Sequence, residues 1–61
     1  MFIVQQHGEW SGSDAPDLDF EADTLEQARE IVRDEIPKGI IYIIYAVGSD
    51  DEYRLVEESV R

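Results

Sequence analysis

The residues whose types and spacing suggest chemistry are the acids between residues 17 and 23. Asp17, Asp19 and Glu21 alternate with apolar residues. On a strand, alternate side chains share a face and lie about 6.6–6.8 Å apart, a spacing comparable to that of neighbouring phosphates along a DNA strand. Such a row of carboxylates can imitate nucleic acid in the basic groove of a DNA- or RNA-binding protein. The predicted acidic face, as a partner-binding surface, comprises Asp14, Asp17, Asp19, Glu21, Asp23, Glu26, Glu30 and Asp34.

The same acids resemble a calcium-binding loop only superficially. An EF-hand loop has Gly at its sixth position and Glu at its twelfth. Counted from Asp17, those positions hold Ala22 and Ala28. The alternation also spreads the carboxylates along a strand instead of around one ion. Because the chain has no Cys and one His, it offers no thiolate or imidazole cluster either. We therefore predict no metal site and no cofactor.

Catalysis would have to come from the stretch around His7. His7 and Glu9 would share a strand face, and Ser11 and Ser13 follow. A nucleophile, a base and an orienting acid must meet in a cleft that excludes water, and a chain of 61 residues rarely forms one. The sequence also has no Gly-rich phosphate loop and no nucleophile elbow. We expect a protein that is not an enzyme, with His7 at the end of a strand.

The most apolar segment is Ile40–Val47, bounded by Gly39 and Gly48. Both of its faces are apolar, which indicates a central strand. One helix can cover one sheet face, and the other would remain an apolar patch of the kind that marks interfaces. We predict a homodimer across this face, through Ile41, Ile43, Tyr45 and Trp10, or the docking of a partner protein on the same face. The alternative is that loops and the Trp10 region fold over it.

One helix must position these residues. Thr24 and Gln27 have the spacing of a capping box. Leu25, Ala28, Ile31, Val32 and Ile36 form one apolar stripe. Pro37 ends the helix, because the residue before a proline disfavours the helical conformation. On the solvent side, ion pairs are expected between Glu26 and Arg29 and between Glu30 and Arg33.

Strands are predicted over residues 1–6, 17–22, 40–47 and 52–58, with a loop at 11–16, a turn at 48–51 and a tail from residue 57 that frays. The fold class is therefore α+β: one small domain over residues 1–61, in the order ββαββ, or βαββ without the second strand. The sheet is of the antiparallel type, with the helix packed on one face.

Charge limits the partners. Fifteen acids against five bases give a net charge of −10. A field of that sign repels nucleic acid and anionic membranes and attracts basic proteins, so we expect no direct nucleic-acid or membrane binding. Acidity that only confers solubility, or adaptation to a high-salt cytoplasm, are the competing explanations. No apolar run approaches the roughly 20 residues of a membrane span, and the N-terminus has no signal-peptide pattern, so a cytoplasmic location is expected.

The layout of a strand or hairpin, a helix capped by Thr24, and a hairpin carrying Tyr53–Glu57 is similar to small accessory proteins of phage and other mobile elements. This resemblance covers the whole chain, rests on layout alone, and implies a protein that binds and inhibits a host protein. We expect a small acidic interaction module that self-associates. Two alternatives stay open: a nucleic-acid mimic that blocks a DNA- or RNA-binding protein, and a structural subunit of a larger assembly.

Overall fold

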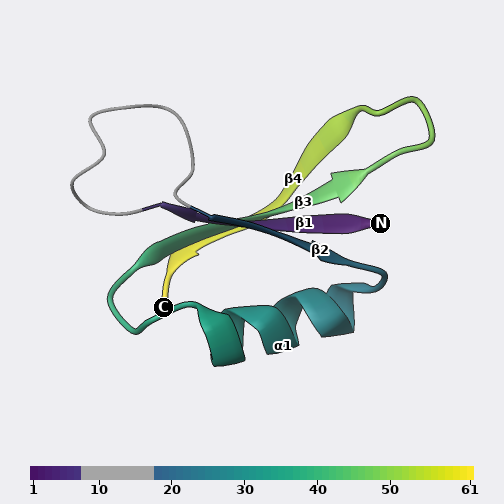
Figure 1. Cartoon of the computed structure of the whole chain (residues 1–61). Helices are drawn as coiled ribbons and strands as arrows, with labels where there is room; N and C mark the ends of the chain where they lie inside the picture. Colours follow the sequence, from purple (N-terminus) through teal and green to yellow (C-terminus); the bar gives the residue numbers. More distant parts are fainter. Residues whose placement is uncertain (8–17) are drawn as a thin grey trace.

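In the computed structural model, which describes residues 1–7 and 18–61, the chain forms four strands and one helix (Figure 1). All strand pairings are antiparallel, and the sheet order is β2-β1-β3-β4. The predicted α+β fold and its ββαββ order are confirmed. The elements along the chain are β1 (Phe2–His7), β2 (Leu18–Ala22), α1 (Leu25–Glu35), β3 (Ile41–Val47) and β4 (Tyr53–Val60).

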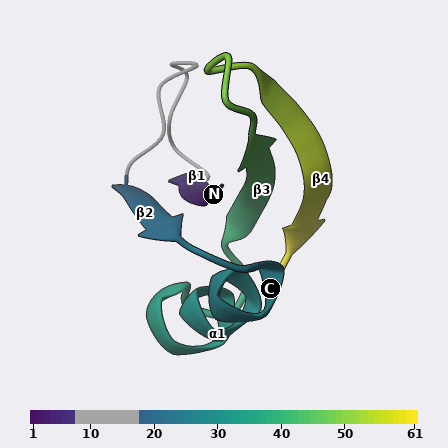
Figure 2. The same cartoon turned by 90° about the vertical axis from the view of Figure 1, so that its right-hand side faces the viewer.

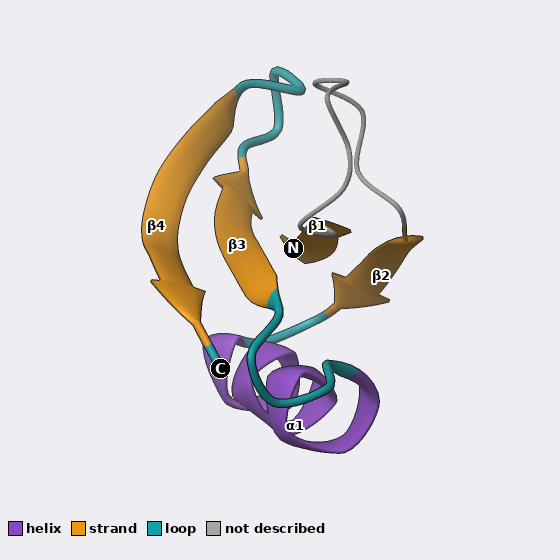
Figure 3. Ribbon diagram, turned by 90° about the vertical axis from the view of Figure 1, so that its left-hand side faces the viewer, coloured by secondary structure: helices purple, strands orange, loops and turns teal. Residues whose placement is uncertain are grey.

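The two central strands are β1 and β3, each of which pairs on both sides. Figure 3 shows the order β4, β3, β1, β2 across the sheet, with α1 packed on one side. Among the described strands, β2 and β4 are therefore the two edges. The first two strands pair antiparallel, and the central position predicted for the apolar segment 40–47 is confirmed.

Local sequence sets both ends of α1. The Thr24 hydroxyl accepts the Gln27 N–H at 3.1 Å, and the Gln27 side-chain oxygen accepts the Asp23 N–H at 2.9 Å. The first bond satisfies a backbone donor that the first helical turn leaves free, and the second satisfies the N–H of the residue before the N-cap Thr24. The helix ends at Glu35, with Ile36 as its C-cap, directly before Pro37. The chain then turns through Gly39 at φ 87°, a conformation that glycine adopts without steric cost.

The core lies between α1 and one face of the sheet, the helix-covered face. Val4, Ile44 and Ile36 are the largest side chains that are fully buried. Ala28 and Val32 of α1 and Ala22 of β2 complete the buried cluster, with Phe2 and Phe20 packed against it. The helix lies mainly over β1 and β2 (Figure 2). Within the described part of the chain, no helix has the length and apolar character needed to cross a membrane.

The ion pairs of α1 differ from those expected. Arg29 contacts Glu57 of β4 at 3.4 Å, and Arg33 contacts its neighbour Asp34 at 3.2 Å, whereas the sequence predicted pairs with Glu26 and Glu30. The side chain of Arg29 therefore extends from α1 to β4. A partner on another element is not visible in helical spacing, so the sequence could not predict it.

Candidate protein-interaction surface

The second face of the sheet, opposite α1, is here called the open face. Cross-strand partners share a face, and alternate residues of a strand lie on the same side. The pairings place Tyr45 beside Leu55, and Val47 beside Tyr53. The rings of Tyr45 and Tyr53 meet edge to face, with centroids 5.8 Å apart. The open face on β3 and β4 comprises Ile41, Ile43, Tyr45, Val47, Tyr53, Leu55, Glu58 and Val60.

Exposure is uneven across this face. Ile3 and Ile43, on the central strands, are buried at 6% and 9% exposed, and Ile41 and Tyr45 are half-buried. On β4 the apolar side chains are largely exposed: Tyr53 at 53%, Leu55 at 62% and Val60 at 59%. The part of the open face that another molecule can contact is therefore concentrated on the edge strand β4.

This arrangement refines the residues predicted for self-association. Ile41, Ile43 and Tyr45 do lie together, on the face that α1 leaves uncovered. Trp10 lies outside the described residues. The most exposed apolar side chains of this face, Tyr53, Leu55 and Val60, were not among the predicted set.

The sequence predicts a strand that ends at residue 58 and a tail that frays, which left Val60 out, whereas β4 continues to Val60 and a β-bulge sets the direction of its side chain. The pairing register shifts between Ile44 and Tyr45, whose partners are Glu57 and Leu55. Val56 is therefore an extra residue in β4. Simple alternation from Tyr53 would put Val60 on the helix-covered face, whereas the bulge turns it to the open face. The sequence carries no signal for the bulge.

On its other side, β4 is tied to the rest of the fold through Glu57. The Tyr42 hydroxyl donates to the Glu57 carboxylate at 2.7 Å, and Arg29 contacts the same carboxylate. The hydrogen bond to Glu57, with partial burial and the nearby negative charge, raises the pKa of Tyr42 above its usual value. At the end of the strand, the Arg61 guanidinium donates to the Ile36 carbonyl at 3.0 Å. These contacts hold the strand in place from the side of β3 and α1.

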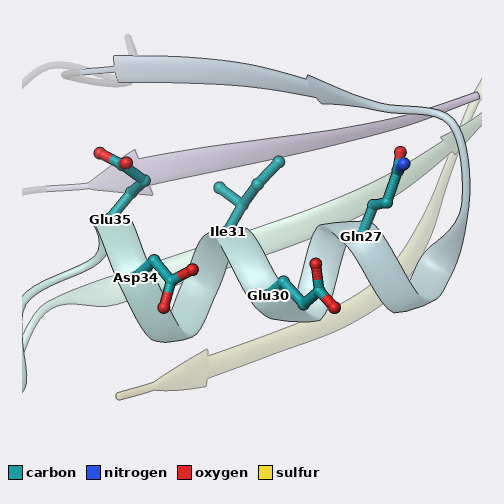
Figure 4. A pocket seen from close by; sticks show the side chains of 5 residues that line it. All are labelled: Gln27, Glu30, Ile31, Asp34 and Glu35. Carbon is teal, nitrogen blue, oxygen red and sulfur yellow. The ribbon is translucent and has the colours of Figure 1, made fainter.

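The predicted acidic face divides into separate groups. Asp19 and Glu21 lie on the open face of β2, because Phe20 and Ala22 face the helix. Glu30 and Asp34 lie on α1, where they line a shallow groove of about 290 Å³ with Gln27, Ile31 and Glu35 (Figure 4). The two groups are on opposite sides of the sheet and do not form one stripe. Asp23 and Glu26 stand at the start of the helix, and Asp14 and Asp17 lie outside the described residues.

The described residues offer no cluster for metal binding. No three His, Asp or Glu side chains within residues 1–7 and 18–61 are placed to hold an ion together. His7 ends β1 as predicted, and its ring nitrogen Nε2 lies 3.3 Å from the Gln5 side-chain oxygen. The other residues considered for catalysis, Glu9, Ser11 and Ser13, lie outside the described residues.

Comparison with known proteins found no similar protein. No model of a protein family matches the chain, and neither a curated protein nor a solved structure is similar to it at a significant level. The case for a function therefore rests on the geometry of the chain itself.

Proposed function

We propose that this chain is a small, non-enzymatic protein-interaction module that binds through the open face of β3 and β4 and self-associates there. The observation that carries the proposal is the exposure of Tyr53, Leu55 and Val60 on a face that α1 does not cover. Large exposed apolar side chains that adjoin one another mark interaction sites more often than those scattered singly.

The size of the chain supports the same function. A domain of about 60 residues buries only about 60% of the surface that its unfolded chain exposes. The chain has no cysteine, so disulfides cannot compensate, and association with another protein surface is one of the remaining routes to stability. Burying the apolar side chains of β4 against a partner would remove them from water and stabilise the complex.

Matched substitutions on the two faces test the proposal. Tyr53 and Leu18 are almost equally exposed, at 53% and 51%, but Leu18 lies on the helix-covered side of β2, opposite Gln6. Sedimentation velocity over a wide concentration range should show a dimer for the unchanged chain. The dimer should be lost in Tyr53→Glu and retained in Leu18→Glu. A chain that stays monomeric at every concentration contradicts self-association.

A second candidate, a nucleic-acid mimic, is supported by one specific observation. Asp19 and Glu21 project from the same face of an edge strand, with the two-residue spacing of about 6.6–6.8 Å. In this role the acidic edge would occupy the basic groove of a DNA- or RNA-binding protein, and DNA would compete for it. Binding would also fall steeply as salt rises. Charge reversal, Asp19→Lys with Glu21→Lys, should abolish that binding while the β4 dimer persists.

A further inference from the structure

We infer that the partner on β4 is a second copy of this chain, joined edge to edge so that the two β4 strands pair antiparallel and the two sheets become continuous. This inference rests on the proposed self-association and specifies its geometry. It follows from three features of β4: the direction of its free backbone groups, the spacing that the bulge produces, and the charges at its two ends.

The backbone directions can be read from bonds at the two ends of the β3–β4 pair. The Val47 N–H donates to the Met1 carbonyl, so Val47 points toward β1 and away from its β4 partner Tyr53. The Arg61 N–H donates to the Ile40 carbonyl, which turns Arg61 toward β3 and Val60 outward. Because direction alternates along a strand, the residues of β4 whose N–H and C=O groups face the free edge are Tyr53, Leu55, Glu58 and Val60.

The bulge adds one residue to β4 between the outward residues Leu55 and Glu58. The outward residues pair with alternate residues of β3, namely Val47, Tyr45, Ile43 and Ile41. These β3 partners are spaced at about 6.8 Å, twice the strand rise, so the outward residues of β4 keep step with β3 although Leu55 and Glu58 are three apart in sequence. A row of free donors and acceptors along a sheet edge is a template for an added strand.

A two-fold axis between Val56 and Glu57 gives a self-complementary register. Tyr53 then faces the partner's Val60, and Leu55 faces the partner's Glu58, each pair joining two outward residues. Every such contact occurs twice, as in any isologous interface. The apolar parts of the two open faces become one continuous surface of Tyr53, Leu55 and Val60 from both copies.

Charge favours this antiparallel arrangement at its two ends, whereas the two copies of Glu57 lie near each other beside the two-fold axis. In the same register Glu52 lies opposite the partner's Arg61, so opposite charges meet at both ends of the interface. Arg54 lies diagonal to the partner's Glu57 on the helix-covered side, within the reach of a long side chain. Two copies that each carry −10 repel one another, and β4 is where arginines offset the acids: Arg54 lies within the strand, Arg61 directly follows it, and Arg29 reaches it from α1.

Cysteine cross-linking tests the register, because the chain has no cysteine of its own. Val56→Cys places the thiol beside the two-fold axis, close to its copy. Val60→Cys is the matched control, since Val60 and Tyr53 pair with β3 residues six apart. The two copies of residue 60 would therefore lie about 20 Å apart at about 3.3 Å per residue. A disulfide needs Cα atoms within about 7 Å.

Under mild oxidation, we expect Val56→Cys to form a covalent dimer at a rate on the order of tenfold faster than Val60→Cys. Equal or reversed rates in a chain that still sediments as a dimer would overturn edge pairing and leave the proposed open-face association standing. A chain that neither dimerises nor cross-links would overturn both. Circular dichroism of each variant before oxidation establishes that the fold is intact.

Discussion

The two edges of the sheet, β2 and β4, face the same solvent and differ in almost every property that governs strand pairing. β2 has five residues, carries Asp19 and Glu21 on its open face, and has α1 packed beneath it. β4 has eight residues, exposes Tyr53, Leu55 and Val60, and is linked to α1 through the Arg29–Glu57 contact.

Short length, charged side chains and β-bulges are among the features by which natural proteins prevent an edge strand from pairing with another chain. β2 is short and acidic, whereas β4 is longer and apolar at three of its four outward residues, with Glu58 as the charged one and the bulge at Val56. The net charge of −10 is thus unevenly distributed over the molecule. In the proposed dimer, acidity would protect one edge and leave the other available, so association would be directional.

The largest expected effect separates the helix-covered core from the β4 edge. Ile36→Ala, at a side chain only 1% exposed, should lower the free energy of unfolding by about 2–5 kcal/mol. Leu55→Ala, at 62% exposed, should change it by no more than about 0.5 kcal/mol in dilute, monomeric protein. Urea denaturation followed by circular dichroism measures both. Similar losses for the two variants would mean that β4 contributes to the folded core and is not a free edge.

The second prediction concerns the acidic side chains that keep β2 from pairing with another strand. Asp19→Asn with Glu21→Gln should let this edge pair as well, so that protomers join at both edges and form species larger than a dimer. The association constant should rise on the order of tenfold, equivalent to about 1.4 kcal/mol. Light scattering measures the average mass. Glu26→Gln with Glu30→Gln makes the same charge change on α1 and should leave the mass unchanged; an equal rise in both variants would point to net charge alone.

The smallest effect concerns how β4 is held to the fold. Glu57→Gln should bring the raised pKa of Tyr42 back toward its usual value, because it removes the carboxylate that accepts the hydroxyl hydrogen bond. Ultraviolet titration of tyrosinate absorbance measures this, with Glu58→Gln on the open face as the control. A Tyr42 titration that is the same in both variants would show that this hydrogen bond does not control the ionisation.

The same bond predicts a pH dependence of stability. Because the pKa of Tyr42 is higher in the folded chain, the contribution of the hydrogen bond is fully present below the unfolded pKa of about 10 and is lost as pH rises through the folded value. The partly exposed Arg29–Glu57 contact should add less than about 0.5 kcal/mol. Stability should therefore fall more steeply above pH 10 in the unchanged chain than in Glu57→Gln.

Much of the fold could be predicted because its signals are local. The spacing of Thr24 and Gln27, the apolar stripe of α1 and the stop at Pro37 each act within a few residues, and the structure reproduces them. Of the candidate interface, the sequence indicated the apolar segment but not its exposed border. It also grouped Asp19 and Glu21 with Glu30 and Asp34, which the structure separates onto opposite sides of the sheet.

By itself, the sequence determined the class of fold, the ends of the helix, the central place of Ile41–Val47 and the acidity of the chain, because hydrophobic periodicity, capping and composition are properties of short segments. Only the tertiary structure decided which sheet face α1 covers, that β4 is an edge, and that a bulge at Val56 turns Val60 toward the open face. These outcomes depend on pairing between segments far apart in the chain, where packing and strand register compete and local preference has no influence.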